Sequence, residues 1–275
     1  MTPSFDFLTE EERALGDRFR RDGFIVAPAE DRAALDAIRD LMVGLARRRL
    51  GMEEGPERSG PPGRLLDRIG DFVSVEALNA FRLAMIGGMN AEPWLRAAYF
   101  SVARRTLSAI VGSELCMQRR VNLSIQLPDD DSSLLPVHAD TWSGDSPFEV
   151  VLWIPLVDCH GSKSMFLLPP GPNAELERTL HCFADRSVDG MFAAIEPDLT
   201  WMEVPYGHFL LFNQNLAHGN RVNREADARW SMNCRFKGVF TPYADKKLGE
   251  FFEPITLRPA SRIGLDYEMP AGFHE

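Results

Sequence analysis

Two histidines and an aspartate are the residues of this chain best suited to bind a metal ion. His138 and Asp140 are separated by a single residue, so in an extended chain their side chains point to the same side. A second histidine, His218, comes much later in the sequence. Two imidazoles and one carboxylate can occupy one face of a non-haem Fe(II) ion and leave coordination positions open. If the fold brings His218 back to the first pair, these residues form such a site.

A basic residue follows the distal histidine at a short interval. Arg229 lies in the run Arg229-Trp230-Ser231, and alternation along a strand would place Arg229 and Ser231 on one face. A guanidinium is permanently charged and carries its donors in a fork, so a buried arginine could hold a dicarboxylate in bidentate fashion. Arg235 has the same parity on the same expected strand and is the rival anchor.

Polar and apolar residues alternate from Met117 to Leu127, which predicts a strand. In a sheet that faces solvent, the polar side would be ordinary surface. We favour the wall of an internal cavity, because the polar side chains include amides, which are costly to bury without partners. The polar positions are Gln118, Arg120, Asn122, Ser124 and Gln126.

The pattern His-X-Asp, a distal His and then Arg-X-Ser resembles that of the Fe(II)/2-oxoglutarate-dependent oxygenases, in particular the phytanoyl-CoA hydroxylase-like branch. The resemblance extends over residues 117–240. It implies a double-stranded β-helix, a cupin-like jelly roll, that binds Fe(II) and uses 2-oxoglutarate and O₂ as co-substrates. Segments 236–247 and 253–258 look like a bacterial subgroup found in carbohydrate-biosynthesis gene clusters.

The resemblance implies roles for the residues around the metal ligands. Arg229 would bind the distal carboxylate of 2-oxoglutarate, with the Ser231 hydroxyl as a second donor. Asn122 or Gln126, from the polar side of the expected strand, would donate to the carboxylate nearer the metal. Trp153 would either form a wall of the co-substrate site or belong to the core.

Three further side chains are candidates for contacts with the substrate, namely Trp142, Arg120 and Arg235. Trp142 follows Asp140 closely and could stack on a sugar or another ring, and a buried aromatic residue in a loop is the equal alternative. The related halogenases lack the carboxylate that Asp140 provides. The resemblance therefore implies oxidation, with hydroxylation first and desaturation or ring oxidation as alternatives, of a small polar substrate derived from a carbohydrate or another natural product.

The order of the expected elements predicts an all-β core with a helical cover. Residues 1–112 carry helical patterns, including a capping box at Thr9 and Glu12. Residues 113–240 carry short strand-like segments between Gly/Pro turns, which favours a jelly roll, and residues 241–275 form a tail. We expect a single oxygenase domain over residues 1–275. The Gly/Pro-rich segment 51–63 or the tail would close over the substrate.

Composition narrows the function classes further. The 275 residues carry a net charge of −10, which argues against a nucleic-acid partner. The four cysteines are scattered, so they indicate neither a disulfide framework nor a zinc knuckle. The acidic N-terminus is unlike a signal peptide, and no run of about 18 apolar residues is long enough to span a membrane. We expect a cytoplasmic protein with a small-molecule substrate and no membrane partner, whose oligomeric state the sequence leaves open.

Two other interpretations fit part of the pattern. A non-catalytic jelly-roll carbohydrate-binding module would use the histidines for structure, but it has no need of Arg229 and Ser231 at this interval. A cupin-type metal isomerase would need the same types of ligand, but it would not consume 2-oxoglutarate.

Overall fold

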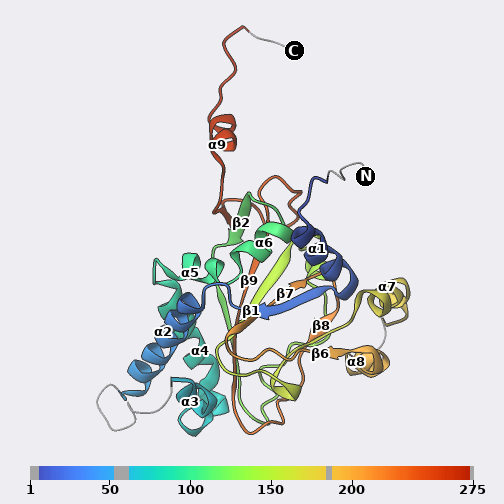
Figure 1. Ribbon diagram of the computed structural model, residues 1–275. Coiled ribbons are helices and arrows are strands. Elements are labelled where there is room, and N and C mark those ends of the chain that lie inside the picture. Colours follow the sequence, from blue (N-terminus) through green and yellow to red (C-terminus); the bar gives the residue numbers. More distant parts are fainter. Residues whose placement is uncertain (1–5, 53–61, 184–187, 273–275) are drawn as a thin grey trace.

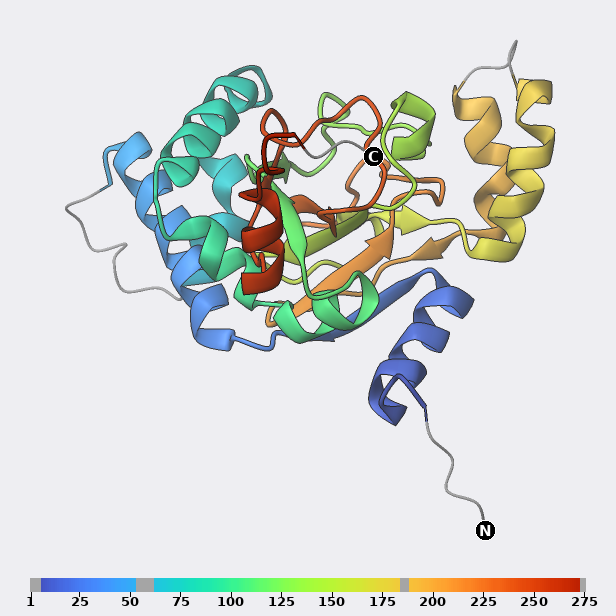
Figure 2. The same cartoon turned by 90° about the horizontal axis from the view of Figure 1, so that it is seen from above.

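A computed structural model of the chain describes residues 6–52, 62–183 and 188–272. Helices α2 to α5 lie together on one side of a β-sheet (Figures 1 and 2). The predicted capping box is confirmed, because the Thr9 side chain accepts from the Glu12 N–H at the start of α1. The helices of this part are α1 (Glu10–Asp22), α2 (Arg32–Leu50), α3 (Pro62–Asp67), η2 (Ile69–Asp71), α4 (Val75–Asn90), α5 (Leu95–Ser101) and α6 (Arg104–Ile110).

Seven strands form the main antiparallel sheet. Their order is β1-β7-β4-β9-β2-β10, and β3 also pairs with β9. The long strand β9 therefore connects β4 on one side with β2 and β3 on the other. These strands are β1 (Phe24–Pro28), β2 (Leu115–Gln118), β3 (Asn122–Gln126), β4 (Val150–Pro155), β7 (His208–Asn213), β9 (Arg229–Gly238) and β10 (Phe252–Pro254).

Three short strands form a second antiparallel sheet, in the order β6-β5-β8. They are β5 (Phe166–Leu167), β6 (Thr200–Trp201) and β8 (His218–Gly219). Within the described ranges the two sheets share no strand, so they form an open jelly roll and not a closed barrel. The predicted fold class, an all-β jelly-roll core preceded by helices, is confirmed.

The face of the main sheet that turns toward the helices is apolar. Trp230 of β9 is completely buried and meets the ring of Phe81 of α4 edge to face, with centroids 6.1 Å apart. The hydroxyl of buried Tyr99, in α5, donates to the carbonyl of Leu152 in β4 at 2.7 Å. These contacts fix the helical cover on the sheet and satisfy the one polar atom that Tyr99 brings into the core.

The opposite face of the main sheet, called the inner face below, carries the polar positions of β3. Because side chains alternate along a strand, directly paired residues share a face. The polar residues of β3 thus share a face with Arg229 and its alternate neighbours on β9. The pairs on the inner face are Gln126–Arg229, Ser124–Ser231, Asn122–Asn233 and Trp153–Asn233.

The strand expected from Met117 to Leu127 is interrupted, so the prediction of one continuous strand was wrong. Met117 pairs with Phe236 and Asn122 pairs with Asn233. Residues 118–121 therefore lie opposite residues 234–235 only, and the extra residues form a bulge. Arg120 lies in this bend and is exposed, whereas the sequence pattern had placed it on the polar strand face.

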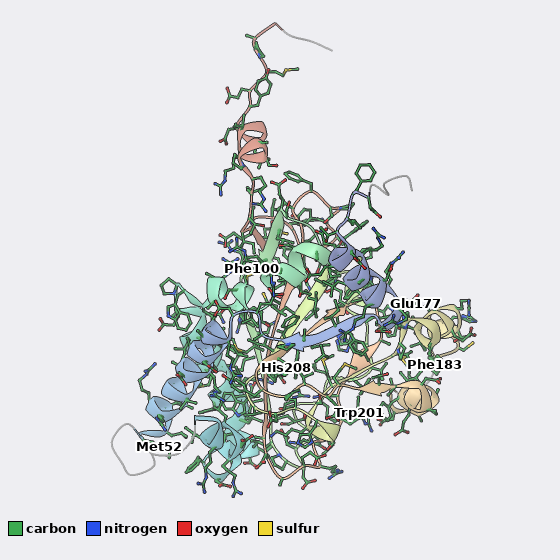
Figure 3. The ribbon with its side chains drawn as sticks, viewed as in Figure 1. Met52, Phe100, Glu177, Phe183, Trp201 and His208 are labelled. Atoms are coloured by element: carbon green, nitrogen blue, oxygen red, sulfur yellow. The ribbon has the colours of Figure 1, made fainter. Side chains whose placement is uncertain are left out.

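A helical insertion that the sequence pattern did not predict joins β5 to β6. It lies at the end of the molecule away from α2 (Figures 1 and 2). Phe183 and Trp201 lie at this end (Figure 3) and pack against a second apolar cluster that includes Phe166 and Phe192. The elements of the insertion are α7 (Pro170–Thr179), η5 (Leu180–Phe183), α8 (Val188–Ile195) and η6 (Glu196–Asp198).

The C-terminal segment contributes a strand to the main sheet before it leaves the body. Phe252 of β10 pairs with Gln118 of β2, and α9 (Pro259–Leu265) projects outward (Figure 1). Within the Gly/Pro-rich segment 51–63, residues 53–61 lie outside the described residues. Closure of either segment over a substrate stays a prediction. No helix in the described ranges has the length and apolar character needed to cross a membrane.

Candidate metal and co-substrate site

His138, Asp140 and His218 come together where the small sheet meets the large one. One potential ligand atom from each residue lies within 4.8 Å of the others. His218 lies in β8, and its ring contacts Phe212 of β7 at a centroid distance of 5.1 Å. Asp140 begins the short helix η3 (Asp140–Ser143), and its N–H donates to the carbonyl of Gln214 at 3.1 Å. The fold thus brings His218 close to His138 and Asp140, as a shared metal site requires.

Hydrogen bonds hold both imidazoles in the tautomer that a metal ligand needs. Nδ1 of His138 lies 2.7 Å from the carbonyl oxygen of Pro136, and Nδ1 of His218 lies 2.8 Å from that of Leu216. A carbonyl oxygen only accepts, so Nδ1 carries the proton in each ring. Nε2 therefore keeps its lone pair, which suits coordination of a metal ion.

The charge state of His218 also suits a metal ligand. Burial, together with the neighbouring ring of His138, lowers the pKa of His218 to about 4. The ring is therefore neutral at physiological pH, as an imidazole must be to bind a metal ion. The carboxylate of Asp140 is close by, with its Oδ1 atom 3.7 Å from Nε2 of His138. The donor set is two imidazoles and one carboxylate, which fits Fe(II).

The second oxygen of the Asp140 carboxylate contacts Arg235 of β9. Nη2 of Arg235 lies 2.8 Å from Oδ2 of Asp140, and Nε of Arg235 donates to Oε1 of Gln214 at 3.2 Å. Nε also lies 3.2 Å from Oδ2 of Asp145. The sequence pattern made Arg235 a rival anchor for a dicarboxylate or a substrate contact. In the structure its guanidinium is instead engaged by acidic side chains of the protein.

Arg229 is buried at the other end of the inner face of β9. Its residue exposure is 3%. Nη1 donates to the carbonyl of Ser164 at 2.9 Å, and Nη2 donates to the hydroxyl of Ser124 at 3.0 Å. Among the described residues no Asp or Glu forms an ion pair with it, and burial lowers the pKa of Arg229 to about 10. A buried cation without a counter-charge is costly, so this arrangement fits an anionic ligand.

Other polar atoms around Arg229 also lack partners within the described part of the chain. They are Nε of Arg229 itself and the hydroxyl oxygens of Ser231 and Ser164, all of which are buried. Buried donors without acceptors are rare in folded proteins, and a bound carboxylate accepts from a guanidinium and from hydroxyls alike. The unpartnered atoms therefore fit the distal carboxylate of 2-oxoglutarate.

The amides expected to contact the nearer carboxylate have protein partners. Nδ2 of Asn122 donates to Oδ1 of Asn233 across the strands at 3.0 Å. Gln126 is completely buried, and its Nε2 donates to the carbonyl of Arg221 at 2.7 Å. Trp153 is buried on the inner face, opposite Asn233, so it lies both in the core and on the polar face.

The residues expected to contact the substrate lie at different distances in the fold from the metal-ligand candidates. Trp142 lies in η3 with Asp140, is half-buried, and packs against the second apolar cluster. Arg120 is exposed in the bulge between β2 and β3. Of the three candidates, Trp142 shares a short helix with a potential metal ligand.

Two further residues shape this site, namely Ser124, which the sequence pattern placed only on the polar strand face, and Gly219, which it did not single out. The hydroxyl of Ser124 orients Arg229, and its position opposite Ser231 emerges only from the strand register. Gly219 follows His218, and a Cβ atom added there would lie 2.7 Å from the carbonyl oxygen of Leu135. The dipeptide His218-Gly219 was the available signal, because glycine permits a close approach of backbones.

Comparisons with known protein families and with curated protein sequences give no match. Solved structures do match. The nickel complex of ThoJ, described as a non-heme monooxygenase, is 17% identical with a TM-score of 0.50, and the match covers 82% of this chain and 77% of that chain. Apo ThoJ gives a TM-score of 0.52 at 15% identity with the same coverage.

A third structure of similar fold is EvdMO1, which is 15% identical with a TM-score of 0.51. The match covers 83% of this chain and 50% of EvdMO1, so this chain corresponds to about half of that protein. At these levels of identity the likeness concerns the fold. The chain therefore has the jelly-roll fold of structures such as the non-heme monooxygenase ThoJ, as the sequence pattern predicted.

Proposed function

We propose that this protein is an Fe(II)/2-oxoglutarate-dependent oxygenase. The observation that carries the proposal is the buried guanidinium of Arg229, which has no carboxylate partner among the described residues. It lies on the inner face of β9, the face from which Arg235 reaches the potential metal ligand Asp140. A site with a three-residue ligand cluster and a separate unpaired cation suits a metal-chelating acid that carries a second carboxylate.

His138, Asp140 and His218 would hold Fe(II) on one side and leave positions for the 2-oxo acid group and O₂. When bound, the iron supplies the redox chemistry in which O₂ and 2-oxoglutarate give succinate and CO₂ while one oxygen atom enters the substrate. The protein itself contributes orientation. Arg229 would grip the distal carboxylate, and Ser231 would donate a further hydrogen bond to it.

The inner-face residues also limit how 2-oxoglutarate can lie. Ser124 and the carbonyl of Ser164 fix the plane of the Arg229 guanidinium, so the donor fork is oriented before the ligand binds. Trp153 offers an apolar surface on the same face. Asn122 and Gln126 already bind protein groups, so within this proposal they support the walls of the site.

The proposed reaction is hydroxylation of a small polar molecule derived from a carbohydrate or another natural product. Support comes from the likeness of the C-terminal segments to the carbohydrate-cluster subgroup and from the fold shared with a non-heme monooxygenase. Trp142 would lie beside the substrate, since it shares η3 with Asp140. The helical cover, the jelly roll and the C-terminal strand would act as one domain, because β10 pairs with β2 of the main sheet.

Anaerobic binding tests this proposal directly. Addition of Fe(II) and then 2-oxoglutarate to the apoprotein should give a weak visible charge-transfer band, and admission of O₂ should then produce succinate. Neither a binding module nor a metal isomerase would turn 2-oxoglutarate into succinate. Absence of both the band and succinate formation would refute the assignment.

A further inference from the structure

A series of ion pairs joins the metal-ligand candidate Asp140 to the C-terminal segment, residues 241–275. Its Oδ2 atom lies 2.8 Å from Nη2 of Arg235, and Nε of the same guanidinium lies 3.2 Å from Oδ2 of Asp145. The side chains are 10%, 16% and 2% exposed, respectively. Lys246 forms a further ion pair with Oδ2 of Asp145 and is itself 28% exposed.

The backbone of the C-terminal segment is fastened to the loop that carries Asp145. The hydroxyl of Ser146 donates to the carbonyl of Pro242 at 2.7 Å, and the N–H of Asp245 donates to the carbonyl of Gly144 at 3.2 Å. Gly144 has a φ of +89°, and a Cβ atom there would lie 2.2 Å from Oδ2 of Asp245. The close approach of the two segments therefore depends on glycine at this position.

We propose that Arg235 is a positioning residue for Asp140 and that the C-terminal segment, through Lys246 and Asp145, is a structural part of the metal centre. The inference rests on the proposed function, in that Asp140 is taken to bind the metal. A carboxylate has two equivalent oxygens and rotates about one bond. By engaging Oδ2, the guanidinium leaves Oδ1, the oxygen nearer His138, free for the metal.

The balance of charges explains why both cations, Arg235 and Lys246, are needed in this series of ion pairs. Arg235 alone lies between two buried carboxylates, Asp140 and Asp145. Lys246 adds a second cation at Asp145, so Asp140 and Asp145 each have a counter-charge. Without Lys246, Asp145 would draw Arg235 more strongly, and the guanidinium would hold Asp140 less firmly. A residue far from the metal ligands in sequence would thus affect metal affinity.

Titration of the apoprotein with Co(II) under anaerobic conditions tests the inference without any turnover. We expect Arg235→Met to weaken Co(II) binding about 10- to 100-fold, the usual effect of losing a group that orients a metal ligand. Arg235→Lys should recover part of the loss, because it keeps the charge but not the fork. Lys246→Met acts on Asp140 only through Asp145 and Arg235, so it should weaken binding less, by about 3- to 10-fold, and should change the ligand-field absorption of bound Co(II).

Lys247→Met is the matched control. Lys247 is the neighbouring lysine, and its ammonium group contacts the backbone carbonyl of Ala244 and not Asp145. We expect this variant to bind Co(II) as the wild type does. Equal affinity and equal absorption spectra for Lys246→Met and Lys247→Met would overturn the inference, and if Arg235→Met does not fold, this pair decides. Failure of the wild-type protein to bind Co(II) would instead contradict the proposed function.

Discussion

His138 and His218 pair through their backbones, because each N–H donates to the carbonyl oxygen of the other residue, at 3.0 and 2.8 Å. This bridge brings the two ring centroids within 4.3 Å. The spacing of the two imidazoles is therefore set by main-chain hydrogen bonds and by how closely the two segments approach. Gly219 lies in the second segment, against the carbonyl oxygens of Leu135 and Pro136.

Replacement of Gly219 by alanine should push the two histidine-bearing segments apart. The new Cβ atom would lie 2.7 Å from a backbone oxygen of Leu135 and 2.9 Å from the ring of Phe166. Overpacking of this kind typically costs about 1–3 kcal/mol, and displacement of one ligand should weaken Fe(II) binding by about tenfold or more. Anaerobic Fe(II) titration measures the effect. Gly171→Ala, at a glycine with open space around it, is the control and should bind Fe(II) normally.

Replacement of His218 by alanine should abolish tight Fe(II) binding and succinate formation while leaving the fold intact. One of the three proposed ligand groups is lost, while the bridge to His138 is made by main-chain atoms and is kept. Metal titration and circular dichroism of the variant measure the two effects. His160→Ala removes an exposed histidine outside the ligand cluster and serves as the control. Wild-type iron affinity in His218→Ala would rule out the proposed ligand set.

Replacement of Arg229 by alanine should weaken 2-oxoglutarate binding while Fe(II) affinity stays near that of the wild type. Loss of one partner of a desolvated charge pair costs about 2–5 kcal/mol. This corresponds to about 30-fold to several-thousand-fold weaker binding, at about 1.4 kcal/mol per factor of ten. Equilibrium binding of 2-oxoglutarate to the Fe(II)-loaded protein without O₂ measures the change.

Two further variants serve as controls for the measurement of 2-oxoglutarate binding. Arg224→Ala removes an exposed arginine that pairs with Asp129 and should leave 2-oxoglutarate binding unchanged. Arg235→Ala tests the rival anchor. If Arg235→Ala lost 2-oxoglutarate at unchanged metal affinity while Arg229→Ala retained it, the assignment of the anchor would be wrong.

The stability of the apoprotein should depend on pH through Glu149, which is 1% exposed. Burial, and then the nearby charge of Asp145, raises the pKa of Glu149 above its usual 4.5. As the pH rises past about 4.5, the unfolded chain releases this proton first, so the free energy of unfolding falls until the folded-state pKa is passed. In Glu149→Gln this contribution is absent.

The free energy of unfolding of Glu149→Gln, relative to that of the wild type, should therefore increase with pH through this window and then become constant. Urea unfolding of the two apoproteins at a series of pH values measures it. Glu196→Gln removes an exposed carboxylate and controls for the change in net charge. A difference between Glu149→Gln and wild type that does not vary with pH would show that Glu149 titrates alike in both states.

The sequence determined the features that depend on neighbouring residues. The Thr9–Glu12 capping box could be predicted, since a cap and the N–H groups it satisfies lie within one helical turn. The shared face of Arg229 and Ser231 follows from strand alternation, and the strand pairing agrees with it. The sequence also shows the types of the three metal-ligand candidates, because their potential ligand atoms belong to the side chains themselves.

Only the tertiary structure decided which of these groups meet and which find other partners. Arg229 and Arg235 have the same parity on one strand, yet Arg235 is engaged by Asp140 and Asp145, whereas Arg229 is buried with no acidic partner among the residues that the structure describes. The bulge that removes Arg120 from the polar face also arises between segments distant in the chain. Local pattern fixes the direction of a side chain, but its counter-charge depends on strand register and on loops brought in from elsewhere.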